Sequence, residues 1–184
     1  MRLEFSASLP FILSESLVLI KRFISKLILK KKRGVSFLKK IYIGADHAGF
    51  KLKEKIKKYF DKKNIAYADL GNLVYDKTDD YPDFAFRVAE NIVRDKTYGI
   101  LLCGSAQGMV IAANKVKGAR AVAINNIRDA KSSKFDDDSN ILCLAGRTLN
   151  SIKAKKILKI WLDTPFSKLT RHKRRVKKIT KYES

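Results

Sequence analysis

From residue 39 onward, short apolar segments alternate with longer amphipathic ones, and this alternation constrains the fold more than any other feature of the chain. Apolar runs bounded by turn residues predict buried strands, whereas apolar residues at helical spacing predict helices. Strands are predicted at 40–44, 65–70, 99–102, 119–124 and 140–144, and helices at 50–62, 82–94, 107–115, 127–135, 151–163 and about 165–180. Because alternating strands and helices form βαβ units, we predict a doubly wound, Rossmann-like α/β fold, a three-layer α/β/α domain with a five-stranded parallel sheet.

Residues 1–38 differ in composition from this domain. Their apolar stretch at 9–29 is interrupted by one acidic and three basic residues, so it lacks the uninterrupted run of about 20 that a membrane-spanning helix needs. A basic amphipathic helix in contact with a membrane surface, an organellar targeting sequence and an upstream extension of the reading frame all fit this pattern. We favour a dispensable extension, followed by the α/β domain at 39–165 and a basic C-terminal helix at 166–184.

The formal net charge of +22 is concentrated at the two ends of the chain. Residues 1–40 carry ten Lys and Arg against two acidic residues, and residues 166–184 carry eight against one. The middle is therefore only mildly basic. Nucleic-acid interfaces usually interleave basic residues with aromatic ones or belong to a recognisable module, and neither pattern is present. We predict solvated lysine-rich helix faces and no specific nucleic-acid partner.

Two other classes of protein are disfavoured by what the sequence lacks. Cys103 and Cys143 are the only cysteines, too few for a disulfide framework or a cysteine-rich metal site. Neither Gly-Lys-Ser/Thr nor G-x-G-x-x-G occurs, so nucleotide binding is weakly supported. A reducing compartment is the default for such a chain, which predicts a cytoplasmic location, with organellar targeting by residues 1–38 as the alternative.

Reactive side chains gather where predicted strands end, which is where sheets of this kind bind ligands. The residues that follow the first and third strands are Asp46, His47, Cys103, Gly104, Ser105 and Gly108. The helix predicted at 107–115 begins beside Cys103, and N–H groups at a helix start favour a thiolate or an oxyanion. If these two strands are neighbours, a carboxylate, an imidazole, a thiol and a hydroxyl meet in one crevice. A structural histidine and a cysteine that merely fills the core remain the alternatives.

A basic run near the C-terminus offers a site for an anion. Arg171 and Arg175 are four residues apart, which places both guanidinium groups on one face of a helix. Guanidinium groups bind phosphate oxygens with two parallel hydrogen bonds. A solvated basic tail is the alternative interpretation of this run.

Five segments of the chain carry a family resemblance, and they occur in the family's order. They are IYIGADHAGF (41–50), DDYPDFA (79–85), ILLCGSAQGMVIAANKVKGARA (100–121), SNILCLAGR (139–147) and RHKRRVKKI (171–179). Together they closely resemble ribose-5-phosphate isomerase type B, a sugar-phosphate isomerase family that also includes the galactose-6-phosphate isomerase subunits. The resemblance extends from about residue 40 to residue 179 and leaves only the N-terminal extension uncovered.

The resemblance implies an aldose–ketose isomerase that acts through a cis-enediolate, without a metal or an organic cofactor. Cys103 matches the family's base, and the amides of the loop 104–108 would stabilise the enediolate oxygens. The other matched residues would assist proton movement (Ser105), bind and open the sugar ring (Asp46 and His47), lie near the substrate (Tyr81) and grip the phosphate (Arg171 and Arg175). In the family the C-terminal segment reaches a neighbouring subunit's site, which implies a homodimer or a higher homo-oligomer.

Two departures from the family pattern concern the substrate. Asp136 and Asp137 stand where many members have a histidine and an asparagine that assist ring opening and substrate binding. Gly-Ser-Ala at 104–106 stands where Gly-Thr-Gly is usual, so Ala106 replaces the second glycine. An aspartate can still act as a general base but cannot carry positive charge, so ring opening would fall to Asp46 and His47. We predict a ribose 5-phosphate isomerase. The alternatives are an isomerase of galactose 6-phosphate or allose 6-phosphate, and a non-catalytic relative that binds anionic partners.

Overall fold

A computed structural model describes residues 40–183, so the predicted extension at 1–38 lies outside the described residues. The strands are β1 (Ile41–Ala45), β2 (Tyr67–Asp69), β3 (Gly99–Cys103), β4 (Ala121–Ala123) and β5 (Ile141–Ala145). The helices are α2 (His47–Lys63), α3 (Tyr81–Asp95), α4 (Gln107–Ala113), α5 (Ile127–Phe135), α6 (Ser151–Asp163) and α7 (Thr170–Tyr182).

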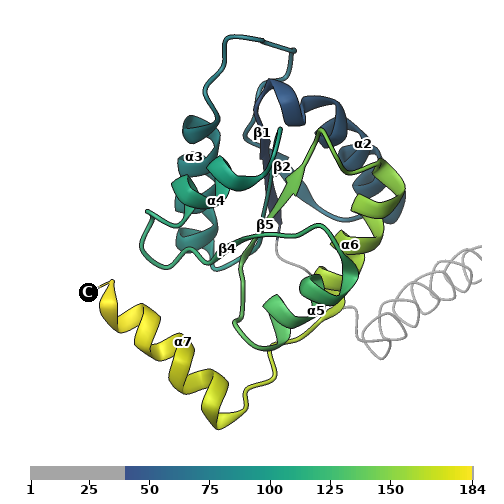
Figure 1. The fold of residues 1–184 in the computed structure, drawn as a ribbon. Helices are drawn as coiled ribbons and strands as arrows, with labels where there is room; N and C mark the ends of the chain where they lie inside the picture. Colours follow the sequence, from purple (N-terminus) through teal and green to yellow (C-terminus); the bar gives the residue numbers. More distant parts are fainter. Residues whose placement is uncertain (1–39, 184) are drawn as a thin grey trace, which may run out of the picture. The chain divides into compact units, whose positions relative to one another are not determined.

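The five strands form one parallel sheet in the order β2-β1-β3-β5-β4 (Figure 1). In the middle of the sheet Ala45 is opposite Leu102, and Cys103 is opposite Ala145. Every residue of β1 and β3 is buried, as expected when helices cover both faces of a parallel sheet. The predicted fold class is confirmed, and the first and third strands are neighbours as the crevice between their loops requires.

Alternation along the central strands divides the core between the two faces of the sheet. Ile100 and Leu102 pack against α2, α5 and α6, whereas Leu101 and Cys103 pack against α3 and α4. Figure 1 shows these two groups of helices on opposite sides of the sheet. Cys103 is therefore the last residue of a strand whose side chain faces the α3 and α4 layer.

Element boundaries differ from the predicted ones where tertiary contacts intervene. The edge strands β2 and β4 are shorter than predicted because each pairs with a neighbour on one side only. Helix α2 begins at His47 rather than at residue 50, since Asp46 Oδ1 caps it by accepting a hydrogen bond from the Gly49 N–H at 2.9 Å. Helix α7 begins at Thr170 rather than near 165, because Ser167 N–H donates to the Phe135 carbonyl outside any helix.

Among the helices of residues 40–183, none is long and apolar enough to cross a membrane.

A lysine is buried in the layer formed by α5 and α6. Lys134 is 1% exposed, and its Nζ lies 4.0 Å from the centroid of the Tyr98 ring and 5.0 Å from that of Trp161. It donates to the Ser139 carbonyl at 3.0 Å, while Trp161 Nε1 donates to the Ser139 hydroxyl at 2.8 Å. Burial lowers the pKa of Lys134 to about 8, only partly offset by Asp138. The lysine thus anchors the turn that precedes β5.

We predict that Lys134 makes the protein more stable as the pH rises from about 8 to 10.5. Because its pKa is about 8 in the fold and 10.5 as the reference value, the unfolded chain binds more protons in this range. The difference corresponds to at most about 3 kcal/mol. Urea unfolding of the wild type and of Lys134→Met across this range checks it. The variant should lose the rise, whereas Lys131→Met, at an exposed position of the same helix, should keep it.

Candidate functional site

Three loops meet at the carboxyl edge of the sheet, each following one of its central strands. Asp46 N–H, after β1, donates to the Leu102 carbonyl at 3.2 Å, and Gly146 N–H, after β5, donates to the Cys103 carbonyl at 2.7 Å. The loop after β5 also presses on the start of α2, since a β-carbon added at Gly146 would lie 2.5 Å from the Ala48 carbonyl oxygen. Main-chain contacts therefore hold the three loops in one fixed arrangement around Cys103.

Cys103 lies at the centre of this arrangement with its thiol directed to the following loop. Its Sγ accepts a hydrogen bond from the Ala106 N–H at 3.1 Å, and the residue is 5% exposed. A main-chain N–H at the start of α4 is therefore directed at the sulfur. Ser105, one residue before that amide, is exposed to solvent. The thiol, the Ala106 amide and the exposed Ser105 thus lie within one four-residue loop.

The second cysteine offers no comparable chemistry. Cys143 is fully buried in β5, opposite Leu101, and burial raises the pKa of its thiol well above the ordinary value. Both cysteines are free. Of the two thiols, Cys103 is the one that lies at the carboxyl edge of the sheet, as the last residue of β3.

Asp46 and His47 lie at the same edge of the sheet, where α2 begins. Burial raises the pKa of Asp46, although its cap hydrogen bond from Gly49 opposes the shift. The His47 side chain is 31% exposed, and its Nδ1 lies 2.7 Å from Oδ1 of Asp79. A buried carboxylate and a half-exposed imidazole thus stand side by side next to the Cys103 loop.

Tyr81 packs against the start of α4, next to the loop that follows Cys103. A β-carbon added at Gly108 would lie 2.6 Å from Cζ of Tyr81, so the phenol ring rests directly on the first turn of α4. The tyrosine is 39% exposed. Gly108 therefore contributes the space that the ring occupies, beside the loop that carries Cys103.

Arg147 is a site residue that the sequence analysis did not single out. A β-carbon added at Gly104 would lie 2.9 Å from the guanidinium carbon of Arg147, so this cation lies against the residue that follows Cys103. Arg147 N–H also donates to the Gly104 carbonyl at 3.2 Å. Its position just after β5, at the same edge of the sheet, is the signal that could have identified it.

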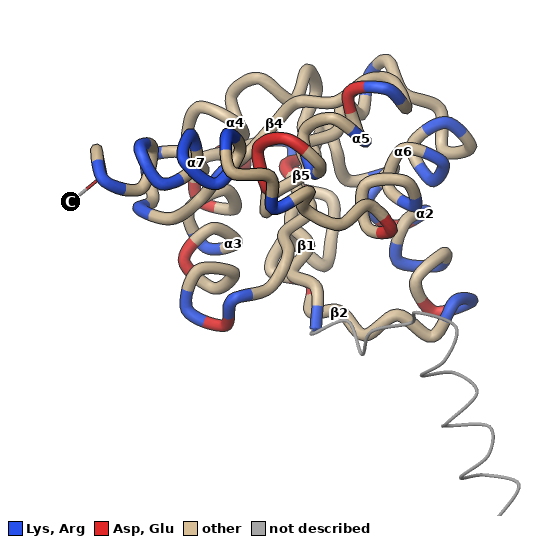
Figure 2. The backbone as a smooth tube through the Cα atoms, turned by 90° about the horizontal axis from the view of Figure 1, so that it is seen from below, with Lys and Arg blue, Asp and Glu red and all other residues tan. Residues whose placement is uncertain are grey.

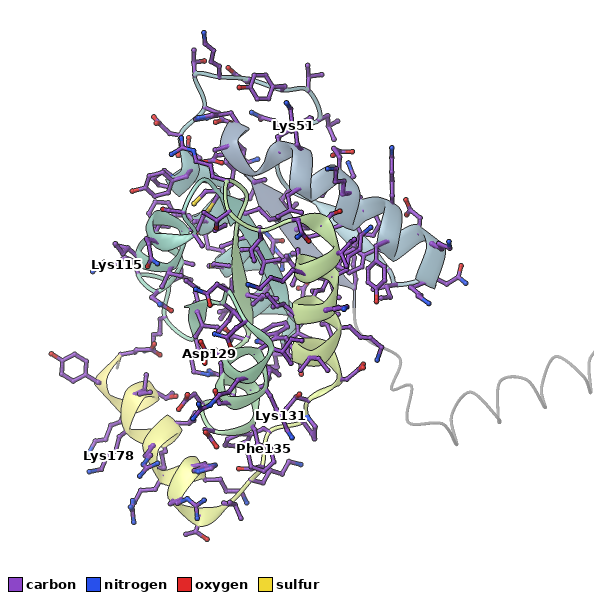
Figure 3. All side chains as sticks on the ribbon, turned by 45° about the vertical axis from the view of Figure 1, so that its right-hand side comes forward. Lys51, Lys115, Asp129, Lys131, Phe135 and Lys178 are labelled. Carbon is purple, nitrogen blue, oxygen red and sulfur yellow. The ribbon has the colours of Figure 1, made fainter. Side chains whose placement is uncertain are left out.

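The remaining predicted residues, Asp136, Asp137, Arg171 and Arg175, lie away from Cys103. Asp136 and Asp137 precede β5, so they lie at the amino edge of the sheet, next to α7. Figure 2 shows the acidic stretch before β5 beside the basic α7. Figure 3 shows Phe135 and Lys178 at that end of the domain and Lys51, near the start of α2, at the other. A single chain therefore does not bring the two groups together.

The start of α7 is held in place by the second histidine. His172 is buried, with Nδ1 2.7 Å from the Ser167 hydroxyl and 3.6 Å from Oδ1 of Asp136. Its Nε2 accepts a hydrogen bond from Arg171 Nε at 3.0 Å. Arg171 and Arg175 themselves are exposed. The arginine pair is therefore presented to solvent from a helix anchored on Phe135 and Asp136.

Comparison with known proteins shows the family to which the chain belongs. The family model described as Ribose/Galactose Isomerase matches residues 41–179. The chain belongs to this family. Within the family, a putative sugar phosphate isomerase of Bacillus subtilis is 41% identical over 145 residues, covering 78% of this chain and 97% of that protein. A probable ribose-5-phosphate isomerase B of Mycoplasma genitalium is 40% identical, covering 78% and 95%.

Solved structures of this isomerase family share the fold described above. A ribose 5-phosphate isomerase of Thermotoga maritima has a TM-score of 0.74 and 40% identity, covering 77% of this chain and 97% of that one. The Mycoplasma genitalium ribose-5-phosphate isomerase B, solved with bound ribulose-5-phosphate, has a TM-score of 0.75 and 38% identity, covering 78% and 95%.

The backbone conformation of Ala106 shows what the replacement of a glycine costs at this position. It has φ 70°, a left-handed conformation that glycine adopts freely and alanine adopts at a cost of roughly 1–2 kcal/mol. The same residue donates its N–H to Cys103. The chain therefore retains at this position the backbone shape that glycine would provide, and it accepts strain beside the thiol.

We predict that Ala106→Gly leaves the free energy of unfolding unchanged or raises it. The relief of the left-handed strain offsets the loss of one buried methyl group, which is worth about 0.8 kcal/mol. Ala113→Gly, a matched control at a buried alanine of α4 without positive φ, should lower it by about 1 kcal/mol or more. Urea unfolding of the two variants tests this, and an equal loss in both would contradict it.

Proposed function

We propose that this chain is an aldose–ketose isomerase that interconverts ribose 5-phosphate and ribulose 5-phosphate. The observation that carries the proposal is the likeness, over nearly the full length of the relative, to an isomerase solved with bound ribulose-5-phosphate. The Cys103 loop supplies the groups that the reaction needs: a base, hydrogen-bond donors for an oxyanion and a hydroxyl. The substrate is a sugar phosphate.

Cys103 acts as the base in this mechanism. As a thiolate, accepting the Ala106 N–H, it removes the proton from C2 of the open-chain aldose and returns a proton to C1. Main-chain amides of the loop 104–108 stabilise the enediolate oxygens that form between these steps. Ser105 relays the proton between O1 and O2, because its hydroxyl both donates and accepts hydrogen bonds.

Asp46, His47 and Tyr81 line the part of the crevice that holds the sugar. Asp46 and His47 bind its hydroxyl groups and open the ring, which brings the aldehyde form to Cys103. Tyr81 packs on Gly108 and positions the chain of the substrate against the first turn of α4. Arg147, beside Gly104, adds positive charge that favours an anionic substrate in this crevice.

The phosphate is gripped by Arg171 and Arg175 of a second copy of the chain. Within one chain these arginines are exposed at the opposite edge of the sheet from Cys103, so the site is completed only by association. Asp136 and Asp137 are placed in the same shared site as these arginines, because Asp136 contacts the histidine that anchors α7. We therefore propose a homodimer, or a higher homo-oligomer built from it, in which each site combines the carboxyl edge of one copy with the amino edge of the other.

We predict that Cys103→Ser lowers kcat for ribose 5-phosphate by about 10²–10⁴-fold and changes KM little. A hydroxyl in place of the thiol keeps the shape of the site but is a far weaker acid, so it does not supply the required base. A coupled assay with the purified full chain measures this. Cys143→Ala, which removes the other thiol from the core, should retain activity, and full activity in Cys103→Ser would exclude Cys103 as the base.

We predict that two inactive variants restore activity when they assemble together. Cys103→Ser disables one edge of the sheet, and the double variant Arg171→Ala, Arg175→Ala disables the other. In a mixed dimer one site receives both defects and the other receives neither, so the purified mixed dimer should have roughly half of the wild-type activity. Co-expression with two affinity tags isolates the mixed dimer. Activity no greater than that of the separate variants would contradict shared sites.

The family description favours a second candidate within the same reaction class, because it includes galactose as well as ribose. Isomerisation of a six-carbon aldose phosphate would use the same base and the same oxyanion donors. Comparing kcat/KM for ribose 5-phosphate, galactose 6-phosphate and allose 6-phosphate distinguishes the two candidates.

We propose a cytoplasmic location, which two free cysteines support.

A further inference from the structure

A carboxylate on the segment between β2 and α3 holds His47 through two hydrogen bonds. Asp79 Oδ1 accepts from the His47 main-chain N–H at 2.9 Å, and it lies 2.7 Å from His47 Nδ1. The side chain of Asp79 is only 6% exposed, against 31% for that of His47. The carboxylate is therefore removed from solvent and directed at one ring nitrogen, and Asp79 itself has no role assigned so far.

This contact determines which nitrogen of His47 is free for chemistry. A carboxylate accepts hydrogen bonds, so the nitrogen that faces Asp79 carries the proton in the neutral ring. Nε2 then has an unshared electron pair. No residue among 40–183 makes a hydrogen bond to Nε2. The half-exposed ring thus presents a base at one nitrogen, and a carboxylate stabilises the positive charge that appears when that base takes a proton.

Asp79 is itself held in place by hydrogen bonds to other residues of its loop and of α2. Its second oxygen accepts from Asn72 Nδ2 at 3.1 Å, and the Asn72 carbonyl accepts from Lys53 Nζ at 2.5 Å. Lys53 is fully buried and also bonds Asp69 at the end of β2. A continuous set of hydrogen bonds thus runs from the core of α2, through the loop, to the imidazole. This arrangement fixes the loop so that Asp79 remains directed at His47.

The same segment connects His47 to the Cys103 loop. Asp79 is two residues before Tyr81, whose ring rests on Gly108 at the start of α4. His47 follows Asp46, which is bonded to the residue before Cys103. A sugar in the crevice would therefore meet His47 and Cys103 from adjacent sides, as a ring-opening step followed by proton transfer requires.

We propose that Asp79 is a positioning residue for ring opening: it fixes the tautomer of His47 and stabilises its protonated form while the sugar ring opens. The inference rests on the proposed function and deepens it. Asp136 does not provide a cationic acid, and within one chain it lies at the other edge of the sheet. A histidine supported by Asp79 provides one beside Cys103.

The step balances within the substrate and His47. Nε2 takes the proton of the O1 hydroxyl, the O1–H electron pair forms the C1=O1 double bond, and the C1–O4 bond breaks with its pair on O4. The imidazolium then gives the proton to O4. The net change is one proton moved from O1 to O4, and a single nitrogen can serve both oxygens because both are bonded to C1. The Asp79 carboxylate, hydrogen-bonded to Nδ1, stabilises the transient positive charge on the ring.

The two directions of the reaction separate ring opening from proton transfer. Ribose 5-phosphate is mainly a ring and must be opened. Ribulose 5-phosphate is open-chain, because the hydroxyl that would close its ring carries the phosphate. Exchange of the C1 proton of ribulose 5-phosphate in deuterium oxide therefore needs the base but not His47 as ring opener. The full chain is assayed for both activities in the wild type, Asp79→Asn and Asp76→Asn.

We expect Asp79→Asn to slow isomerisation of ribose 5-phosphate by about 10-fold or more and to change deuterium exchange into ribulose 5-phosphate by less than about 2-fold. Asp76→Asn is the matched control, because it removes an exposed carboxylate from the same loop that bonds only Thr78. It should leave both rates unchanged. Equal losses in both rates for Asp79→Asn, or no loss in either, would overturn the inference.

Nitrogen NMR provides a readout that does not depend on turnover. The chain has two histidines, so the background variant His172→Asn leaves the signals of His47 alone for assignment. We expect Nδ1 to carry the proton in the wild type and the tautomer ratio to change in Asp79→Asn. An unchanged ratio, or a proton on Nε2 in the wild type, would overturn the inference. A wild-type chain that is inert in both rate assays but shows the expected tautomer would instead overturn the proposed function.

Discussion

The parallel pairing of β1, β3 and β5 is the constraint on which the rest of the structure depends. It sends three loops to one edge of the sheet, where main-chain hydrogen bonds join them, including the one from Gly146 N–H to the Cys103 carbonyl. A β-carbon at Gly49 would lie 2.3 Å from the Leu102 carbonyl oxygen, so α2 approaches β3 as closely as backbone atoms allow. Main-chain contacts therefore fix the arrangement of the three loops, and these loops carry the reactive side chains.

The same topology divides the proposed chemistry between the two edges of the sheet. Proton transfer belongs to the carboxyl edge around Cys103, and phosphate binding belongs to the amino edge and α7. Joining them requires a second copy of the chain, so in this proposal catalytic competence and association are coupled by mass action. In the same proposal, the exposed basic residues of α7 attract the anionic substrate before it binds.

Buried polar groups in the domain serve as anchors for turns and loops. Lys134 binds the turn before β5 between two aromatic rings, and Lys53 binds the loop that carries Asp79. A buried charge is costly unless it is paired or hydrogen-bonded, and both lysines are. Removing either lysine would leave a carbonyl group of a loop without its hydrogen bond from the lysine. The lysines therefore fix the conformation of loops on which the proposed site depends.

The sequence by itself determined the α/β class, the family and the placement of Asp46, His47 and Cys103 at strand ends, because hydrophobic periodicity and contiguous motifs are local properties of the chain. Only the tertiary structure decided the strand order that places Arg147 beside Gly104, and the contact between Asp79 and His47 across 32 residues. It also decided that α7 lies at the opposite edge of the sheet from Cys103. Strand order, loop course and helix docking depend on packing between segments far apart in the chain, and local patterns carry no record of that packing.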